Sequence, residues 1–114
     1  SRGFVFASAV SYILKKPFIM FRKKNKLPAD VHSIDFELEY GTATIEVHKD
    51  SVNENDTVLI IDDLIATGGT AAASCKLIEE LGAEIIGCSF IVELDFLNGR
   101  KKLSNHDVHS LIHY

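Results

Sequence analysis

Two adjacent carboxylates and a glycine loop stand close together in the stretch "VLIIDDLIATGGT", Val58 to Thr70. Asp62 and Asp63 follow four aliphatic residues, which predicts that they lie at the carboxyl end of a buried strand. Ligands bind at that edge in open α/β sheets. A solvated turn or a helix cap explains one such aspartate well, and the pair less well. Because successive side chains point to opposite sides of a strand, we expect the two carboxylates to have separate roles.

The segment "ATGGT", Ala66 to Thr70, is typical of a phosphate cradle. Gly68 and Gly69 permit positive φ and let backbone N–H groups approach an anion. A helix that begins near Thr70 would add unpaired N–H groups and the positive end of its dipole, and Thr67 and Thr70 would add hydroxyl donors. The Walker and dinucleotide-binding patterns do not occur. Together with the carboxylates, this loop indicates a site for a phosphorylated sugar, whose 2′- and 3′-hydroxyls the acids would hold.

The elements that must position these residues alternate between helix and strand, with near-continuous apolar strands, so we expect an α/β fold with a mostly parallel sheet covered on both faces. Pro17 and Gly82 are expected to end the two helices. The expected elements are a helix over Phe4–Leu14, a short strand over Phe18–Phe21, a basic loop "RKKNKLPAD", a hairpin "FELEYGTATIEVH", a strand over Thr57–Ile61, a helix over Thr70–Leu81, a strand "EIIGCSFIVEL", a turn at Asn98-Gly99 and a last strand "VHSLIHY".

Length and composition set the frame for this site. A chain of 114 residues is expected to form one domain, residues 1–114, around a single core. A net charge of −4 argues against nucleic acid or an anionic membrane as a partner. We expect a cytoplasmic protein, because no apolar run reaches membrane-spanning length and no signal-peptide pattern opens the chain. Cys75 and Cys88 are interpreted as two buried free thiols. The first residue is not Met, so we expect an amino-terminal segment to be missing.

The stretch from Val58 to Thr70 resembles the phosphoribosyl-pyrophosphate-binding motif of type I phosphoribosyltransferases. Within that group, "SRGF", "RKKNKLP", "ELEYGTATIEVHKD" and "FIVEL" are similar to the adenine phosphoribosyltransferases, in the same order along the whole chain. The resemblance implies the type I phosphoribosyltransferase fold, in which helices flank a mostly parallel sheet and a flexible β-hairpin flap is inserted.

The resemblance also implies a role for each residue of the motifs. Ala66 to Thr70 would hold the 5′-phosphate, and Asp62 and Asp63 would hold the ribose hydroxyls, partly through water bound to Mg²⁺, so the metal would have no direct protein ligand. Glu39 would be the general acid or base at the purine N7, on the flap. Pyrophosphate would be bound, sometimes across a dimer interface, by four cationic residues: Arg2, Arg22, Lys23 and Lys26. Contact with the base or the flap would come from Tyr40 and Leu94.

The implied reaction belongs to purine salvage: adenine and phosphoribosyl pyrophosphate give AMP and pyrophosphate, in a homodimer that uses Mg²⁺. Two alternatives stay open. The base could be another purine, or the chain could be a non-catalytic regulator that binds the same sugar phosphate. In relatives, a segment before "SRGF" carries much of the contact to adenine, so base recognition by this chain alone is expected to be incomplete and its activity alone is left open.

Several residues have plainer interpretations. Without the resemblance, "RKKNK" is typical of a solvated turn, and alternation along the hairpin does not separate Glu39 from Glu37. We interpret the three carboxyl-terminal histidines as surface or edge residues, because no Cys or carboxylate in their pattern completes a tetrahedral metal site; they are His106, His109 and His113. A core position is favoured for Cys75 over a reactive one.

Overall fold

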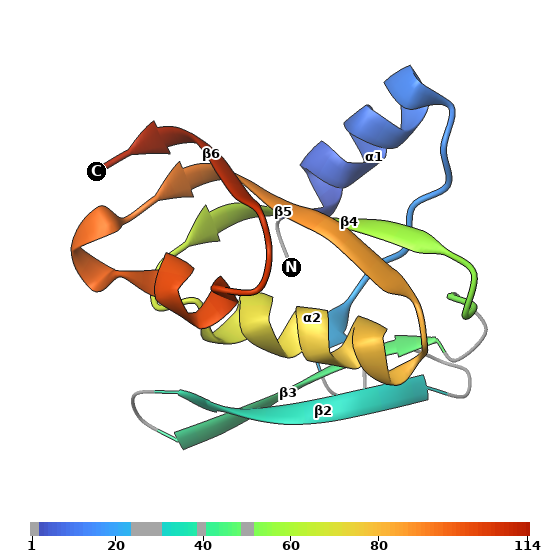
Figure 1. Ribbon diagram of the computed structural model, residues 1–114, viewed down its shortest axis with the longest axis horizontal. Coiled ribbons are helices and arrows are strands. Elements are labelled where there is room, and N and C mark those ends of the chain that lie inside the picture. Colours follow the sequence, from blue (N-terminus) through green and yellow to red (C-terminus); the bar gives the residue numbers. More distant parts are fainter. Residues whose placement is uncertain (1–2, 24–30, 39–40, 49–51) are drawn as a thin grey trace.

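The computed structural model describes residues 3–23, 31–38, 41–48 and 52–114. Four strands follow the first helix, and helices and strands alternate only from β4 onward (Figure 1). The elements are α1 (Phe4–Leu14), β1 (Arg22–Lys23), β2 (Val31–Leu38), β3 (Gly41–His48), β4 (Thr57–Ile65), α2 (Gly69–Glu80), β5 (Glu84–Glu93), the 3₁₀ helices η2 (Asp95–Leu97) and η3 (Gly99–Leu103), and β6 (Val108–His113).

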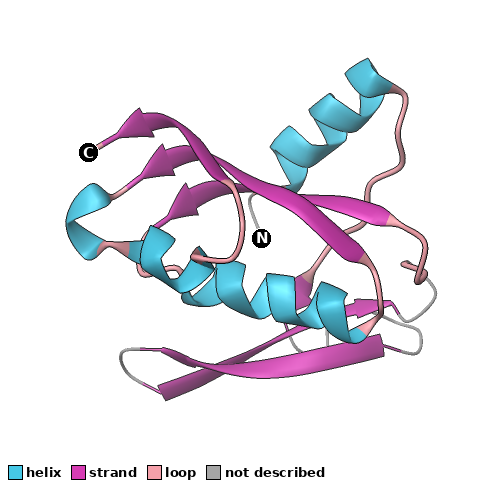
Figure 2. Cartoon of the chain, viewed as in Figure 1, coloured by secondary structure: helices cyan, strands magenta, loops and turns pink. Residues whose placement is uncertain are grey.

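The strands form two separate sheets. One is parallel, with the order β4-β5-β6, and the other is antiparallel, with the order β1-β3-β2. Helix α2 lies between the two sheets, and α1 contacts β4 (Figures 1 and 2). The predicted parallel sheet with flanking helices is confirmed, as is the inserted hairpin, which the structure places in a sheet of its own.

Helix α2 packs on both sheets because its first turns carry small side chains. Ala71 and Cys75 join a core cluster with Ile60 and Phe90 of the parallel sheet. A second face of the helix carries Leu77, which packs with Ala73 and with the hairpin residues Ile45 and Val47. Small residues at the interface let a helix approach a sheet closely, and burial of the large aliphatic side chains Leu77, Ile45 and Val47 stabilises the contact by about 1.5–3 kcal/mol each.

A glycine ends α2 as the sequence predicts. Gly82 has φ +89°, its N–H donates to the Glu79 carbonyl, and the Ala83 N–H reaches back to the Ile78 carbonyl. This pair of bonds is the Schellman arrangement, which satisfies carbonyls that the helix itself leaves unpaired. The chain then enters β5 at Glu84, so a short connection joins the helix to the next parallel strand.

The hairpin is long and regular. Strands β2 and β3 pair from Val31 opposite His48 to Leu38 opposite Gly41, so residues 39 and 40 connect the two strands. The sequence predicts this hairpin from alternation on both sides of Gly41, and the pairing confirms it.

Two sequence predictions about strands are wrong. Residues 18–21 form no strand; instead Ile19 and Phe21 pack, partly buried, against the clusters under α2, so burial alone explains their apolar character. Arg22 and Lys23, expected in a basic loop, pair with Glu46 and Ile45 as strand β1.

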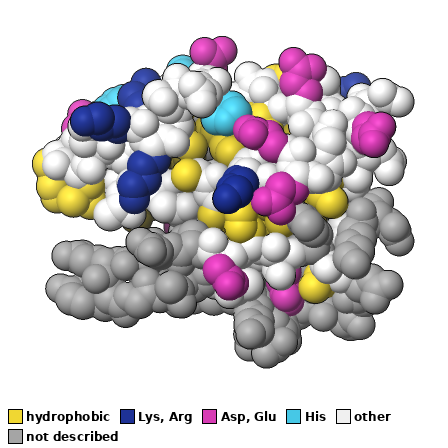
Figure 3. Space-filling model, turned by 60° about the horizontal axis from the view of Figure 1, so that its bottom comes forward, with side chains coloured by type: hydrophobic (Ala, Val, Ile, Leu, Met, Phe, Trp, Pro, Cys, Tyr) yellow, Lys and Arg dark blue, Asp and Glu magenta, His cyan; other side chains and the backbone are white. Residues whose placement is uncertain are grey.

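The two thiols are free and buried, as expected, and their Sγ atoms lie 3.6 Å apart across α2 and β5. The hydrogen bond to Cys88 raises the pKa of Cys75, and burial raises it further, which supports the core interpretation over a reactive thiol. No described helix has both the length and the apolar character needed to cross a bilayer. On the face seen in Figure 3, most Lys and Arg side chains lie on the left half and most Asp and Glu side chains lie in the middle and on the right.

Candidate active site

The two carboxylates lie within β4 rather than after it. The strand runs on to Ile65, so the prediction that it ends at Ile61 is wrong. The reason is that backbone pairing with β5 continues past Ile61: Asp62 stands opposite Phe90, and Leu64 stands opposite Val92. Both side chains are half-buried. The pair still lies in the carboxyl-terminal half of a parallel strand, which is the side of the sheet where ligands bind.

Asp62 is held in a crowded position. Its Oδ1 accepts a hydrogen bond of 2.9 Å from the Asp63 N–H. A Cβ on Gly3 would lie 2.6 Å from that same Oδ1 and 2.8 Å from the Asp62 Cα, so the amino end of α1 passes directly against the aspartate. Burial raises the pKa of Asp62, and a hydrogen bond with the Asp63 side chain adds to the rise. An ionised Asp62 is therefore costly in the absence of a ligand.

The loop Ala66–Thr70, predicted to bind a phosphate, has one left-handed residue. Gly68 has φ +87° and ψ 0°, and a Cβ there would lie 2.4 Å from the Gly99 carbonyl oxygen. Both the backbone conformation and the space therefore require glycine at this position. Gly69 is instead the first residue of α2 and has no positive φ, so the expectation of a left-handed conformation holds for Gly68 and not for Gly69.

The amino terminus of α2 is open toward the loop. Gly68 is the N-cap, and no side chain of the described residues caps the helix there. Thr67 and Thr70 are both exposed on this end. A helix start with free N–H groups, a positive dipole end and two hydroxyls attracts an anion. The arrangement fits a phosphate group next to the two carboxylates of β4.

Leu94 joins the same edge of the sheet. It is half-buried directly after β5, and its N–H donates to the carbonyl of Ile65, the last residue of β4. An open cavity of about 500 Å³ adjoins Asp63 on the side of α1. Its other lining residues are apolar: Val5, Phe6, Leu64, Ile91 and Val92.

The remaining predicted site residues are only partly placed. Arg2, Lys26, Glu39 and Tyr40 lie outside the described residues. Arg22 and Lys23 are placed by their backbone in β1, and their side chains are outside the described part of the chain. The structure therefore brings together the carboxylates, the loop and Leu94, and leaves the roles of the other residues as predictions.

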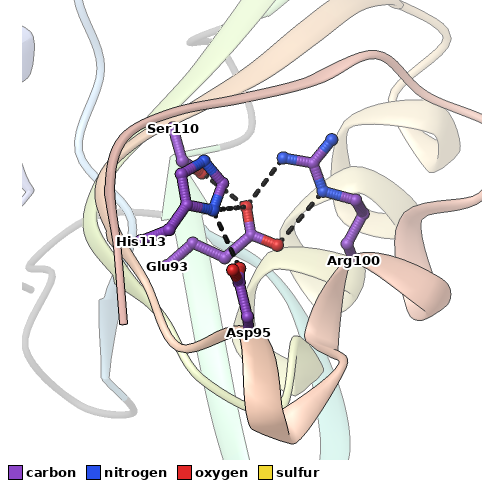
Figure 4. A network of polar contacts seen from close by, with 5 residues as sticks. All are labelled: Glu93, Asp95, Arg100, Ser110 and His113. Carbon is purple, nitrogen blue, oxygen red and sulfur yellow. Dashed lines mark hydrogen bonds and ion pairs between the residues drawn. The ribbon is translucent and has the colours of Figure 1, made fainter.

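A set of polar residues that the sequence reasoning missed lies at the ends of β5 and β6 (Figure 4). Arg100 makes two hydrogen bonds to the buried carboxylate of Glu93, which also accepts a hydrogen bond from Ser110. His113 lies 2.8 Å from Asp95 and 3.8 Å from Glu93. The sequence offered one weak signal, the apolar strand "EIIGCSFIVEL" with a charged residue near its end.

The histidines follow their plain interpretation in part. His109 is exposed, and His106 is half-buried beside Glu79, with 3.1 Å between Nε2 and Oε1. The turn after β5 brings Asp95 back to β6, so Glu93, Asp95 and His113 form a group of three possible metal ligands that includes neither His106 nor His109. Arg100 already compensates the charge of Glu93, which disfavours a cation there.

Residues 1–112 match the family model described as "Phosphoribosyl transferase domain". The adenine phosphoribosyltransferase of Nitrosococcus oceani is 54% identical over all 114 residues, which span 67% of that protein. The chain belongs to the adenine phosphoribosyltransferase family. The family member from Pelagibacter ubique is 71% identical over 103 residues, or 90% of this chain and 59% of that protein. The chain thus spans about three-fifths to two-thirds of the length of these relatives.

Solved structures of family members have the same fold. The adenine phosphoribosyltransferase of Thermoanaerobacter pseudethanolicus matches with a TM-score of 0.97 and 50% identity, over 100% of this chain and 66% of that one. The Saccharomyces cerevisiae adenine phosphoribosyltransferase, solved with an imino-altritol bisphosphate and adenine, matches with a TM-score of 0.93 and 42% identity, over 97% of this chain and 62% of that one. The type I phosphoribosyltransferase fold implied by the sequence is confirmed.

Proposed function

We propose that the protein containing this chain transfers the 5-phosphoribosyl group from phosphoribosyl pyrophosphate to adenine, giving AMP and pyrophosphate. One observation carries the proposal: Asp62 and Asp63 of β4 are followed within a few residues by the left-handed Gly68 at the open start of α2. A carboxylate pair and a helix start that suits an anion therefore lie at one sheet edge, which supports a site for a phosphorylated ribose. The adenine assignment is supported by the names of the relatives.

The phosphoribosyl half of the site is assigned to described residues. Ala66 to Thr70 would bind the 5′-phosphate through backbone N–H groups and the two threonine hydroxyls. Asp62 and Asp63 would accept hydrogen bonds from the ribose hydroxyls. Leu94 would pack against the base at the same edge. These interactions orient the sugar C1 toward adenine, and orientation of two reactants can supply several kcal/mol of the barrier.

The donor set suits magnesium. Two neighbouring half-buried carboxylates supply the oxygen chemistry that Mg²⁺ prefers. Asp62 and Asp63 would hold the ion through bound water, without direct ligation. When bound, Mg²⁺ neutralises negative charge on the substrate's pyrophosphate. The raised pKa of Asp62 is consistent with a carboxylate that is fully ionised only when a cation or ligand compensates its charge.

The remaining roles rest on the resemblance. Arg2, Arg22, Lys23 and Lys26 would bind the pyrophosphate, and Gly3, next in sequence to Arg2, does lie against Asp62. In the reaction, the bond from ribose C1 to pyrophosphate breaks and a bond from C1 to adenine forms, while Glu39 holds or moves a proton at N7 of the base. Tyr40 would help close the flap over the site, which excludes water.

The wider setting is proposed on the same basis. Residues 1–114 would form one phosphoribosyltransferase domain. The protein would act in purine salvage in the cytoplasm as a homodimer, with the cationic residues acting within one subunit or across the interface. Its partners would be small molecules, with no nucleic acid and no membrane.

The direct test is a base panel with the full-length protein. AMP formation from adenine, phosphoribosyl pyrophosphate and Mg²⁺ is measured next to guanine, hypoxanthine and xanthine. We expect turnover with adenine and at least 100-fold lower kcat/KM with the others, because a site built to hydrogen-bond one exocyclic pattern leaves polar groups unpaired with another. Turnover with a different base would reassign the substrate. Tight phosphoribosyl pyrophosphate binding without turnover on any base would instead identify a regulator.

Asp62→Asn is expected to separate stability from function. Because the pKa of Asp62 is raised by burial, the ionised form destabilises the free protein at neutral pH, and this cost disappears as pH falls through the folded-state pKa. The neutral amide avoids the cost, so the melting temperature at pH 7 should rise. Phosphoribosyl pyrophosphate affinity should fall about 10- to 100-fold, since a charged hydrogen-bond partner contributes about 1.5–3 kcal/mol.

Thermal unfolding at pH 5 and pH 8 and calorimetric titration measure both effects. Asp107→Asn, at an exposed aspartate, is the matched control and should change neither. A melting temperature for Asp62→Asn below that of the unchanged protein at pH 8 would contradict the assigned cost of the buried charge.

A further inference from the structure

The turn after β5 packs against the back of the phosphate loop, backbone against backbone. A Cβ on Gly99 would lie 2.3 Å from the Ala66 carbonyl oxygen and 2.9 Å from the Gly68 nitrogen. The approach is mutual, since a Cβ on Gly68 would meet the Gly99 carbonyl oxygen at 2.4 Å. Neither glycine leaves room for a side chain, so Gly99 blocks any movement of the loop toward η3.

Gly99 is itself held from both sides. Asn98, which precedes it, adopts a left-handed conformation with φ 52° that closes the turn. At the other end of η3, Leu103 is 1% exposed and belongs to the core cluster under α2. The residue immediately after Gly99 is Arg100, whose side chain crosses to the end of β5 (Figure 4). The short helix that carries Gly99 is therefore fixed at each end.

The Arg100–Glu93 contact has the geometry of a strong ion pair. Arg100 Nε donates to Glu93 Oε2 at 3.1 Å, and Nη2 donates to Oε1 at 2.7 Å. The Glu93 side chain is 5% exposed, and Ser110 Oγ donates a third hydrogen bond to it at 2.8 Å. Two parallel hydrogen bonds fix orientation as well as distance, which a single lysine cannot do.

The pair is ionised over the whole physiological range. The hydrogen bonds from Arg100 lower the pKa of Glu93 from 4.5 to about 2, against the opposing effect of burial. A lowered pKa means that this stabilisation is complete above about pH 4.5 and is lost as pH falls toward 2. Both groups therefore stay ionised at the pH of any enzyme assay. The ion pair has to be tested by substitution rather than by a change of pH.

We propose that Arg100 and Glu93 are positioning residues for the phosphate loop: their ion pair holds Gly99 against Ala66–Gly68 and so determines the affinity for the 5′-phosphate of the sugar substrate. Neither residue needs to touch the substrate. The inference rests on the proposed function, because it assigns the loop to phosphoribosyl pyrophosphate. It also explains why a charged side chain is buried at the end of β5, directly before the base-contacting Leu94.

The test uses the full-length protein with three variants and one control. Arg100→Gln removes the charge, and Arg100→Lys keeps the charge but cannot make the two parallel hydrogen bonds to Glu93. The double variant Glu93→Gln/Arg100→Gln removes both charges and so leaves no buried charge unpaired. Lys101→Gln is the matched control, because it removes the same charge from an exposed position in the same 3₁₀ helix. Binding of phosphoribosyl pyrophosphate with Mg²⁺ is measured by calorimetry, and KM for each substrate and kcat are measured separately.

For Arg100→Gln we expect Kd and KM for phosphoribosyl pyrophosphate to rise about 10- to 100-fold, because a small displacement of a binding group costs about that much. KM for adenine should change less than threefold. Arg100→Lys should recover part of the loss. The double variant should be no worse than Arg100→Gln, because residues that act as a pair are not additive. Lys101→Gln should bind like the unchanged protein.

The outcomes separate this inference from the proposed function. If the unchanged protein does not bind phosphoribosyl pyrophosphate, the proposed function fails, and this inference fails with it. If it binds but folded Arg100→Gln, judged by circular dichroism, binds equally well, the positioning role alone is overturned. The positioning role would also be overturned if Arg100→Gln raised KM by the same factor for phosphoribosyl pyrophosphate and for adenine and also lowered the melting temperature. That result would indicate a general structural role for the ion pair. If Arg100→Gln does not fold, Arg100→Lys and the double variant take its place. Unchanged affinity of both folded variants for phosphoribosyl pyrophosphate would then overturn the positioning role.

Discussion

Replacing Glu39 by Gln should lower kcat for AMP formation by about 10²–10⁴-fold, the usual contribution of a positioned general acid or base. Glutamine keeps the size of the side chain and its hydrogen-bonding capacity but cannot exchange a proton with the purine N7. Affinity for phosphoribosyl pyrophosphate should stay within about threefold, because the carboxylates lie on β4 and the loop Ala66–Thr70 leads into α2, so the groups assigned to the sugar phosphate belong to other elements than the hairpin. Steady-state kinetics and calorimetric titration measure the two quantities.

Glu37→Gln is the matched control for this prediction. Glu37 lies on β2 opposite Thr42, two residues before Glu39 in the same alternating pattern. Its substitution should leave kcat within about twofold. If Glu37→Gln loses activity and Glu39→Gln does not, the assignment of the acid within "ELEYG" is off by one alternation; if neither variant loses activity, the hairpin supplies no proton-transfer group.

Gly68→Ala should abolish measurable binding of phosphoribosyl pyrophosphate, a loss of at least 100-fold. Two effects coincide at this residue. A non-glycine residue at φ +87° costs about 1–3 kcal/mol, and the added Cβ would lie 2.4 Å from the Gly99 carbonyl oxygen, which is backbone and has little freedom to yield. The loop therefore has to change shape, and the N–H groups at the start of α2 lose their common direction. Calorimetric titration with Mg²⁺ present measures the loss.

Gly82→Ala provides a control for backbone strain alone. Gly82 has nearly the same φ, +89°, but ends α2 at the far side from the loop, and its nearest neighbour is the flexible side chain of Glu54. This variant should unfold at a lower temperature yet bind the sugar phosphate with unchanged affinity. Wild-type-like binding by Gly68→Ala would mean that the loop does not form the phosphate site.

Local patterns predict the elements of this fold well where one signal dominates. Helix α1 matches its predicted bounds, Phe4–Leu14, because the apolar run has a clear stop at Pro17. Helix α2 is displaced by one residue, because Gly69 rather than Thr70 begins it. The predicted end of β4 is wrong by four residues, because adjacent carboxylates are typical of a strand end, whereas here Asp62 pairs with Phe90 and the pairing continues at Leu64 and Ile65. Propensity alone does not detect this tertiary pairing.

The candidate site is predictable only where its chemistry is continuous in sequence. Asp62, Asp63 and the loop lie within nine residues, so spacing reveals them. The Arg100–Glu93 pair is invisible to spacing, because the two residues meet through two 3₁₀ turns that follow no helical or strand period. The contact between Cys75 and Cys88 is hidden for a similar reason, since it depends on how α2 crosses β5.

The position of α2 between two sheets also constrains which side chains this helix can carry. One side of the helix packs on the parallel sheet through Ala71 and Cys75, and another side packs on the hairpin through Ala73 and Leu77. A substitution that enlarges any of these residues displaces a sheet on one side or the other. The loop at the start of α2 and the hairpin that packs on the same helix are therefore expected to shift together when one of these side chains is enlarged.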